Sequence, residues 1–79
     1  HKGRLMILCQ LAEGEKSVGT LVDNLDIGQA GVSQQLSLLR RDGIIAQRRD
    51  GRHIYSRLND ANAALVVQTL YALFCPQLP

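Results

Sequence analysis

The hydrophobic period of the sequence changes abruptly at Asp42-Gly43, and this change fixes the order of elements in the middle of the chain. Before this dipeptide, apolar residues recur at the i, i+4, i+7 spacing that marks one face of a helix, at Val32, Leu36 and Leu39. After it, the pattern becomes typical of short strands. The sequence therefore predicts a helix over residues 29–42 that is followed directly by a hairpin.

The predicted hairpin, or wing, spans residues 44–58. Its two strands flank Asp50-Gly51, a dipeptide that favours a two-residue type I′ turn. A loop of this kind would place Arg49 opposite Arg52. Because like charges that face each other across a hairpin are unfavourable, we expect a polyanion to lie against this tip. A solvated hairpin is the alternative.

A shorter helix is predicted before residue 26. Its apolar residues extend to about Leu25, and either Ser17 or Thr20 is placed to cap its N-terminus. Residues 26–28 then form a tight connection to the next helix. Two short helices joined in this way, over residues 18–42, are typical of a helix-turn-helix.

The outward face of the second of these helices carries small and polar residues rather than Glu and Lys. Ser and Gln side chains can reach base edges in the major groove without large steric demand. We therefore expect this helix to face double-stranded DNA. The residues predicted to face bases are Gln29, Ser33, Gln34 and Gln35, with Ser37 on the same surface.

Basic charge is concentrated between residues 40 and 57. The whole chain has a net charge of only +2, whereas this window is +4, because six arginines there face two aspartates. The planar guanidinium of Arg suits bidentate contacts with phosphate. Charge alone is equally compatible with a solvated basic surface. The residues predicted to contact phosphate or the minor groove are Arg40, Arg41, Arg48, Arg49, Arg52 and His53.

Two further helices are predicted near the ends of the chain, over residues 4–13 and 60–75. Both are apolar on most sides, and a single domain of 79 residues cannot bury such helices completely. We therefore expect the two helices to form the contact of a homodimer. Together, the elements predict one domain over residues 1–79, mostly α-helical with a small β-hairpin, in a winged helix-turn-helix arrangement.

The sequence disfavours several other classes of protein. It offers no paired carboxylates, no plausible nucleophile set and no glycine-rich phosphate loop, so neither an enzyme nor a cofactor is predicted. Aromatic residues make up 4% of the chain, too few for a surface that stacks unpaired bases. No apolar run approaches the ~18 residues of a membrane span, and the protein is expected to be cytoplasmic.

The order of the predicted elements resembles the ArsR family of bacterial repressors, and the resemblance covers nearly the whole chain. Its most specific stretches are residues 29–40, QAGVSQQLSLLR, and residues 43–55, GIIAQRRDGRHIY. The resemblance implies a homodimeric winged helix-turn-helix repressor that binds double-stranded operator DNA.

The chain has two cysteines, Cys9 and Cys75, near its opposite ends. The residue type alone is compatible with inert, buried side chains or with a pair that folding brings together. The thiol, Asp and His ligands of the metal and arsenic sensors in the ArsR family are missing from the corresponding segments. The two thiols are instead similar to those of the persulfide- and sulfide-responsive branch, which implies a redox switch operated by reactive sulfur species or another oxidant.

Two alternatives stay open. A metal-responsive repressor that senses zinc, cadmium or arsenite would use Cys9 and Cys75, with or without a histidine, His1 or His53. A winged helix used only for protein–protein contacts would bind an acidic partner through its arginines, and its binding to DNA would be weak and insensitive to salt.

Overall fold

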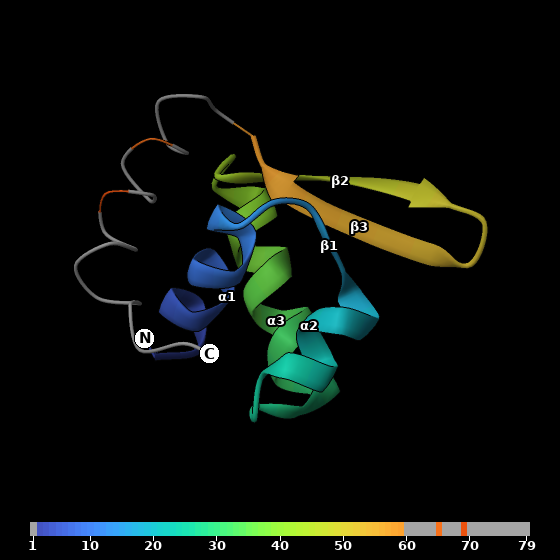
Figure 1. Ribbon diagram of the computed structural model, residues 1–79, viewed down its shortest axis with the longest axis horizontal. Coiled ribbons are helices and arrows are strands. Elements are labelled where there is room, and N and C mark those ends of the chain that lie inside the picture. Colours follow the sequence, from blue (N-terminus) through green and yellow to red (C-terminus); the bar gives the residue numbers. More distant parts are fainter. Residues whose placement is uncertain (1, 60–64, 66–68, 70–79) are drawn as a thin grey trace.

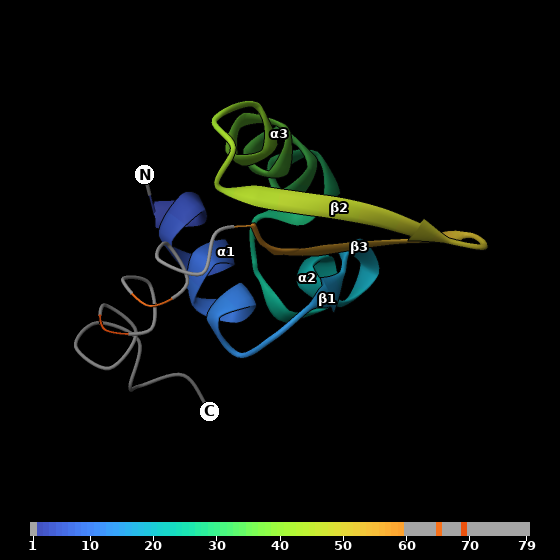
Figure 2. The same cartoon turned by 90° about the horizontal axis from the view of Figure 1, so that it is seen from above.

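The computed structural model describes residues 2–59, 65 and 69 of the chain. Three described helices pack together, and a hairpin projects away from them (Figures 1 and 2). In chain order the elements are α1 (Lys2–Ala12), β1 (Lys16–Ser17), α2 (Val18–Asn24), α3 (Gly28–Arg41), β2 (Ile45–Asp50) and β3 (His53–Leu58). This architecture confirms the predicted fold class, mostly α-helical with a small β-hairpin in a winged helix-turn-helix arrangement.

The terminal helices compare differently with their predictions. α1 begins two residues earlier than the predicted helix at 4–13 and ends one residue earlier, and its first residues include Gly3, which is buried. Glycine carries no hydrophobic signal, so the pattern of apolar residues did not include this position. The predicted closing helix at 60–75 lies outside the described residues, apart from Leu65 and Thr69.

α2 is capped by Ser17, one of the two residues that the sequence left as candidates. The Ser17 Oγ accepts a hydrogen bond of 3.1 Å from the backbone N–H of Thr20, as an N-cap side chain does. The Ser17 hydroxyl in turn donates to the Thr20 Oγ1 at 2.8 Å. Thr20 therefore lies inside the first turn and supports the cap from there.

α3 ends in a Schellman motif, which aims the chain into the hairpin. The N–H of Gly43 donates to the carbonyl of Arg40, and the N–H of Ile44 donates to the carbonyl of Leu39, both at 3.0 Å. Gly43 has a φ of 76°, a conformation that favours glycine. The predicted change of period at Asp42-Gly43 therefore corresponds to a glycine-dependent helix end.

The predicted register of the hairpin is wrong by one residue. Asp50 pairs with His53, so the loop is Gly51-Arg52, and Arg49 lies opposite Ile54 rather than opposite Arg52. A type I′ turn needs a positive φ at both central residues. Gly51 has a φ of 63°, and no described residue other than glycine has a positive φ, so only one central position here is left-handed. The expected repulsion between Arg49 and Arg52 across the strands is therefore absent.

A third strand completes the sheet. β1 pairs antiparallel with β3, which gives the strand order β1-β3-β2, with Lys16 opposite Ser56 and Ser17 opposite Tyr55. Two residues are too few to show a period, so the sequence pattern did not reveal this strand.

The core lies where the three helices meet the base of the sheet. α1 packs against α3 and β3, and α2 packs against the same two elements. The apolar residues buried here come from every helix and from the start of β2: Ile7, Leu11, Leu21, Leu25, Val32, Leu36, Leu39 and Ile45. The outer face of α3 and the distal half of the hairpin are left free of the core.

Candidate functional site

The outer face of α3, the N-terminal end of α2 and the wing enclose a groove of about 470 Å³. Exposed polar residues of α3 line one side, and residues of the hairpin tip line the other. The predicted DNA-contact residues that line this groove are Gln29, Ser33, Ser37, Arg40, Arg52 and His53. The fold thus brings together residues from two elements that the sequence analysis had chosen independently.

Three of the remaining predicted contacts are exposed but lie outside this groove. Gln34 and Arg41 are on α3, and Arg49 lines a second hollow together with Arg40 and Ile54. Ile54 is an exposed apolar residue that lines both hollows. The sequence pattern does not mark it as a site residue, because an apolar residue in a strand is expected to be buried.

Gln35 was predicted to face DNA bases, and the structure contradicts this. Its side chain is only 7% exposed, and it lies on the buried face of α3 with Val32 and Leu39. Residue 35 is three positions after Val32 and four before Leu39, which is the spacing of one helix face. The polar side chain suggested the outer surface, whereas helix geometry places it inside.

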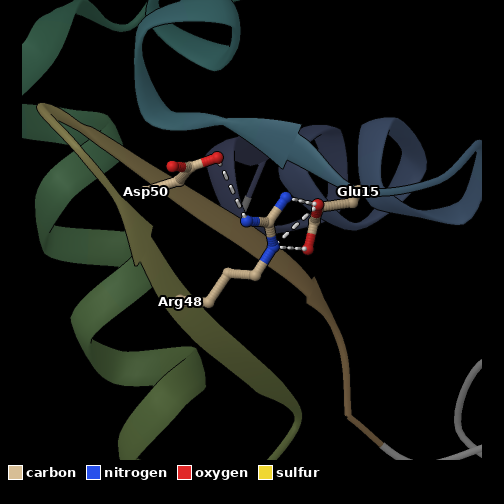
Figure 3. Close-up of polar contacts among 3 residues, drawn as sticks. All are labelled: Glu15, Arg48 and Asp50. Carbon is tan, nitrogen blue, oxygen red and sulfur yellow. Dashed lines mark hydrogen bonds and ion pairs between the residues drawn. The ribbon is translucent and has the colours of Figure 1, made fainter.

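The Arg48 guanidinium, predicted to contact phosphate, is bound to carboxylates of the protein itself (Figure 3). Its Nη2 lies 2.7 Å from Oε1 of Glu15, and its Nε lies 3.0 Å from Oε2. Asp50 approaches Nη1 at 3.8 Å, and the guanidinium stands 4.5 Å from the centroid of the Tyr55 ring. Arg48 therefore holds the wing to the segment between α1 and β1.

The same contact shifts both ionisation equilibria. The hydrogen bonds from Arg48 lower the pKa of the Glu15 carboxyl, and the hydrogen bonds to Glu15 raise the pKa of the Arg48 guanidinium. Both shifts favour the charged forms. A bidentate pair of this geometry is among the stronger surface ion pairs.

Gln47 connects α3 to the wing, and the sequence analysis missed it. Its Oε1 accepts a hydrogen bond of 3.0 Å from Nη1 of Arg40, and its Nε2 donates to Oγ of Ser56 at 3.1 Å. A polar residue in an alternating strand gave no signal of such a role. Two polar residues nine positions apart, Gln47 and Ser56, become visible as a pair only once the register is known.

Arg41, the last of the predicted phosphate contacts on α3, lies beside the helix end. Its Nε is 3.3 Å from Oδ1 of Asp42, and Oδ2 of the same carboxylate is 3.7 Å from Nη1 of Arg4 on α1. Asp42 thereby offsets part of the positive charge of Arg41. Arg49 and Arg52, in contrast, form no ion pair within the part of the chain that the structure describes.

Cys9 lies on α1 and is only 4% exposed. It is disulfide-bonded, so it is not a free thiol. Cys75 lies outside the described residues. Among residues 2–59, 65 and 69, no three His, Cys, Asp or Glu side chains are grouped as a metal site. None of the described helices is long and apolar enough to span a membrane.

Comparison with known proteins places the chain in a family. The model of the bacterial regulatory proteins of the arsR family matches residues 1–47. The Biofilm growth-associated repressor of Xylella fastidiosa (strain Temecula1 / ATCC 700964) is 49% identical over 77 residues, which are 98% of this chain and 68% of the relative.

Two solved structures agree with this placement. The transcriptional repressor BigR from Xylella fastidiosa has a TM-score of 0.86 and 49% identity, over 98% of this chain and 76% of that chain. Reduced HlyU from Vibrio cholerae N16961 has a TM-score of 0.87 and 35% identity, over 95% of this chain and 79% of that chain. These relatives are named as transcriptional regulators and not as enzymes. The chain therefore belongs to the arsR family of bacterial regulatory proteins and is a winged helix-turn-helix transcriptional repressor.

Proposed function

We propose that the protein is a homodimeric, cytoplasmic repressor whose binding to operator DNA is relieved when Cys9 and Cys75 are oxidised or persulfidated. The observation that carries the proposal is the state of Cys9, which is buried in α1 and disulfide-bonded. The sequence contains one other cysteine, Cys75, which we propose as the second thiol of the switch.

The groove between α3 and the wing supports the DNA-binding part of the proposal. Gln29, Ser33 and Ser37 present donors and acceptors suited to base edges in the major groove. Arg40 and Arg52 flank them with positive charge for phosphates. α3 enters the major groove in this arrangement, and the wing lies along the neighbouring backbone.

Exposed leucines support a dimer. Leu5 on α1 is 43% exposed, and Leu65, within the predicted closing helix, is 63% exposed. Both belong to the two segments that the sequence predicted for subunit contact. A second copy of the chain would cover them and would set the distance between the two α3 helices.

The switch is proposed to act through this distance. α1 packs directly against α3 and β3. A bond that ties α1 to the closing segment would therefore shift the position of α3, the proposed recognition helix, relative to the rest of the dimer. Two recognition helices must match half-sites about 34 Å apart along the DNA. A displacement of a few ångströms between subunits therefore weakens binding.

The proposed chemistry balances with an inorganic polysulfide as the oxidant. One cysteine thiolate attacks a sulfane sulfur, which forms a persulfide and releases the polysulfide shortened by one sulfur atom. The second thiolate then attacks the inner sulfur of the persulfide, which forms the disulfide and releases hydrogen sulfide. If both thiols are first persulfidated, one persulfide attacks the other, and a trisulfide forms with loss of hydrogen sulfide.

A binding titration tests the switch. The full-length protein is reduced and used to select duplexes from random-sequence DNA, and its affinity for the selected duplex is then measured before and after treatment with polysulfide. We expect treatment to weaken binding by about 5- to 150-fold, the range of typical allosteric couplings. Mass spectrometry of the same sample should show the two cysteines joined within one chain.

The matched controls are Cys9→Ser and Cys75→Ser. Each variant should bind the duplex as the reduced protein does and should keep this affinity after polysulfide treatment. Equal affinities of the reduced and treated wild-type protein would reject the switch while leaving the repressor in place.

The metal-responsive alternative is tested with the same duplex. Zinc, cadmium or arsenite added to the reduced protein should leave the affinity unchanged if the switch is a dithiol–disulfide pair. A metal-dependent loss of binding that disappears in Cys9→Ser would favour the metal sensor instead.

A further inference from the structure

The strongest unassigned feature of the DNA-binding face is the pair of hydrogen bonds made by Gln47. We propose that Gln47 is a positioning residue for DNA recognition: its amide holds the Arg40 side chain of α3 against the wing, so that the guanidinium is ordered at the groove before DNA binds. The proposal rests on the DNA-binding part of the proposed function and does not depend on the cysteines.

The donor and acceptor chemistry fixes the orientation of the Gln47 amide. A guanidinium has only donors, so the amide oxygen must face Arg40. The amide nitrogen then faces Ser56, whose hydroxyl oxygen is its acceptor at 3.1 Å. A rotation of the amide by half a turn would place N–H against N–H at Arg40 and break that contact. An amide is therefore suited to this bridge, because it accepts at one end and donates at the other.

The anchor of this bridge is rigid. Ser56 is 0% exposed, and it lies on the central strand of the sheet, opposite both Gln47 and Lys16. Arg40, at the other end, is exposed in the last turn of α3 and lines both hollows of the DNA-binding face. The Gln47 amide thus links Arg40, a long side chain with many rotamers, to Ser56, a fully buried polar residue of the wing.

Ordering Arg40 in advance lowers the cost of binding. Immobilising a long side chain at an interface costs an amount that corresponds to about 2- to 12-fold in affinity. Only Nη1 of Arg40 is engaged by Gln47, so the other N–H groups remain for phosphate.

A double-mutant cycle on the reduced, full-length protein tests the proposal. The variants are Gln47→Met, Arg40→Met and the double variant, and the probe is the duplex selected from random-sequence DNA by the wild-type protein. Methionine is about as long as glutamine and has no hydrogen-bonding group like that of either side chain, and at position 40 it also removes the charge. We expect Gln47→Met to lose about 2- to 12-fold in affinity when Arg40 is present and to have no effect when Arg40 is absent. Equal losses in both backgrounds would overturn the proposal.

A second measurement reads the ordering of Arg40 without DNA. The ¹⁵N relaxation of the Arg40 Nε–H group should indicate a restrained side chain in the wild type and a freely moving one in Gln47→Met, with thermal unfolding used to confirm that both are folded. An Arg40 side chain that moves equally in both proteins would also overturn the proposal. If the wild-type protein selects no duplex at all, the proposed function itself fails. If the wild-type protein binds DNA but the effects of the two substitutions are additive, only the role of Gln47 is rejected.

Discussion

Arg48 and Arg49 are neighbours on β2 whose side chains point to opposite faces of the sheet, which makes them a matched pair. Arg48 is bound to Glu15 and Asp50, whereas Arg49 forms no ion pair within the described residues. We expect Arg49→Met to weaken DNA binding. The slope of log K against log salt concentration should also become less steep, by the amount that corresponds to about one phosphate contact per protomer. Arg48→Met should leave the salt dependence unchanged and lower the melting temperature instead. Affinities measured over a range of salt concentrations check both outcomes, and equal slopes for the two variants would contradict the distinction.

The stabilising contribution of Glu15 should depend on pH. Its folded-state pKa is lowered by the hydrogen bonds from Arg48, so the unfolded chain binds the proton more readily. The contribution is therefore fully present above the ordinary pKa of glutamate and is lost as the pH falls through the lowered value. We expect the difference in melting temperature between wild type and Glu15→Gln to be largest near neutral pH and to vanish in acid. Glu13→Gln, whose carboxylate lies within reach of Lys16 instead, is the control for removing one acidic charge from the same segment.

At the level of single residues, the sequence indicated which side chains share one exposed groove better than it indicated the partners of each side chain. Six of the predicted contacts line the groove because they share the outer face of α3 or the hairpin tip. Gln35 was misplaced because a polar side chain outweighed its position on the helix. Arg48 and Gln47 were misjudged because their partners, Glu15 and Ser56, are distant in sequence and meet them only through the sheet.

The end of α3 should be sensitive to one methyl group. Gly43 has a φ of 76°, and a Cβ added to it would meet no atom within 4 Å, so Gly43→Ala adds backbone strain without a clash. We expect a loss of about 1 to 2 kcal/mol in the free energy of unfolding. Gly19→Ala is the matched control: it lies inside α2, where alanine should leave stability unchanged or raise it by up to about 1 kcal/mol. Denaturant unfolding of both variants measures the difference, and equal stabilities would contradict the role given to Gly43.

At the level of elements, strong periodicity was sufficient and short or irregular signals were not. α3 follows from three apolar residues at helical spacing, and the structure moves its bounds by only one residue. The hairpin was predicted from its strand-like pattern, but its loop was placed one residue too early. The Asp50-Gly51 dipeptide suggested a type I′ turn, whereas the loop is Gly51-Arg52 and only Gly51 has a positive φ. β1 exists because β3 offers it an edge to pair with, which is a property of the folded sheet and not of residues 16–17 alone.

For the whole molecule, a steep dependence of DNA binding on salt is expected from the three predicted phosphate contacts that form no ion pair within the described residues, Arg40, Arg49 and Arg52. Two protomers would contribute six contacts, which gives a slope of about −5 for log K against log salt concentration. A winged helix used for protein contacts alone would bind DNA weakly, with a slope near zero. Anisotropy titrations of the selected duplex at several salt concentrations separate the two outcomes.

The shortness of the connection between α1 and the sheet has a further consequence. Only residues 13–15 separate α1 from β1, and β1 is hydrogen-bonded to the wing strand β3. In the proposed switch, a rotation of α1 that follows bond formation at Cys9 would reach the wing through the backbone of this connection, in addition to the Glu15–Arg48 ion pair and the packing of α1 against β3. Lengthening this connection with inserted glycines should uncouple α1 from the wing. Such a protein would still form the proposed bond between Cys9 and Cys75 and would still bind its operator, but polysulfide treatment would no longer weaken the binding.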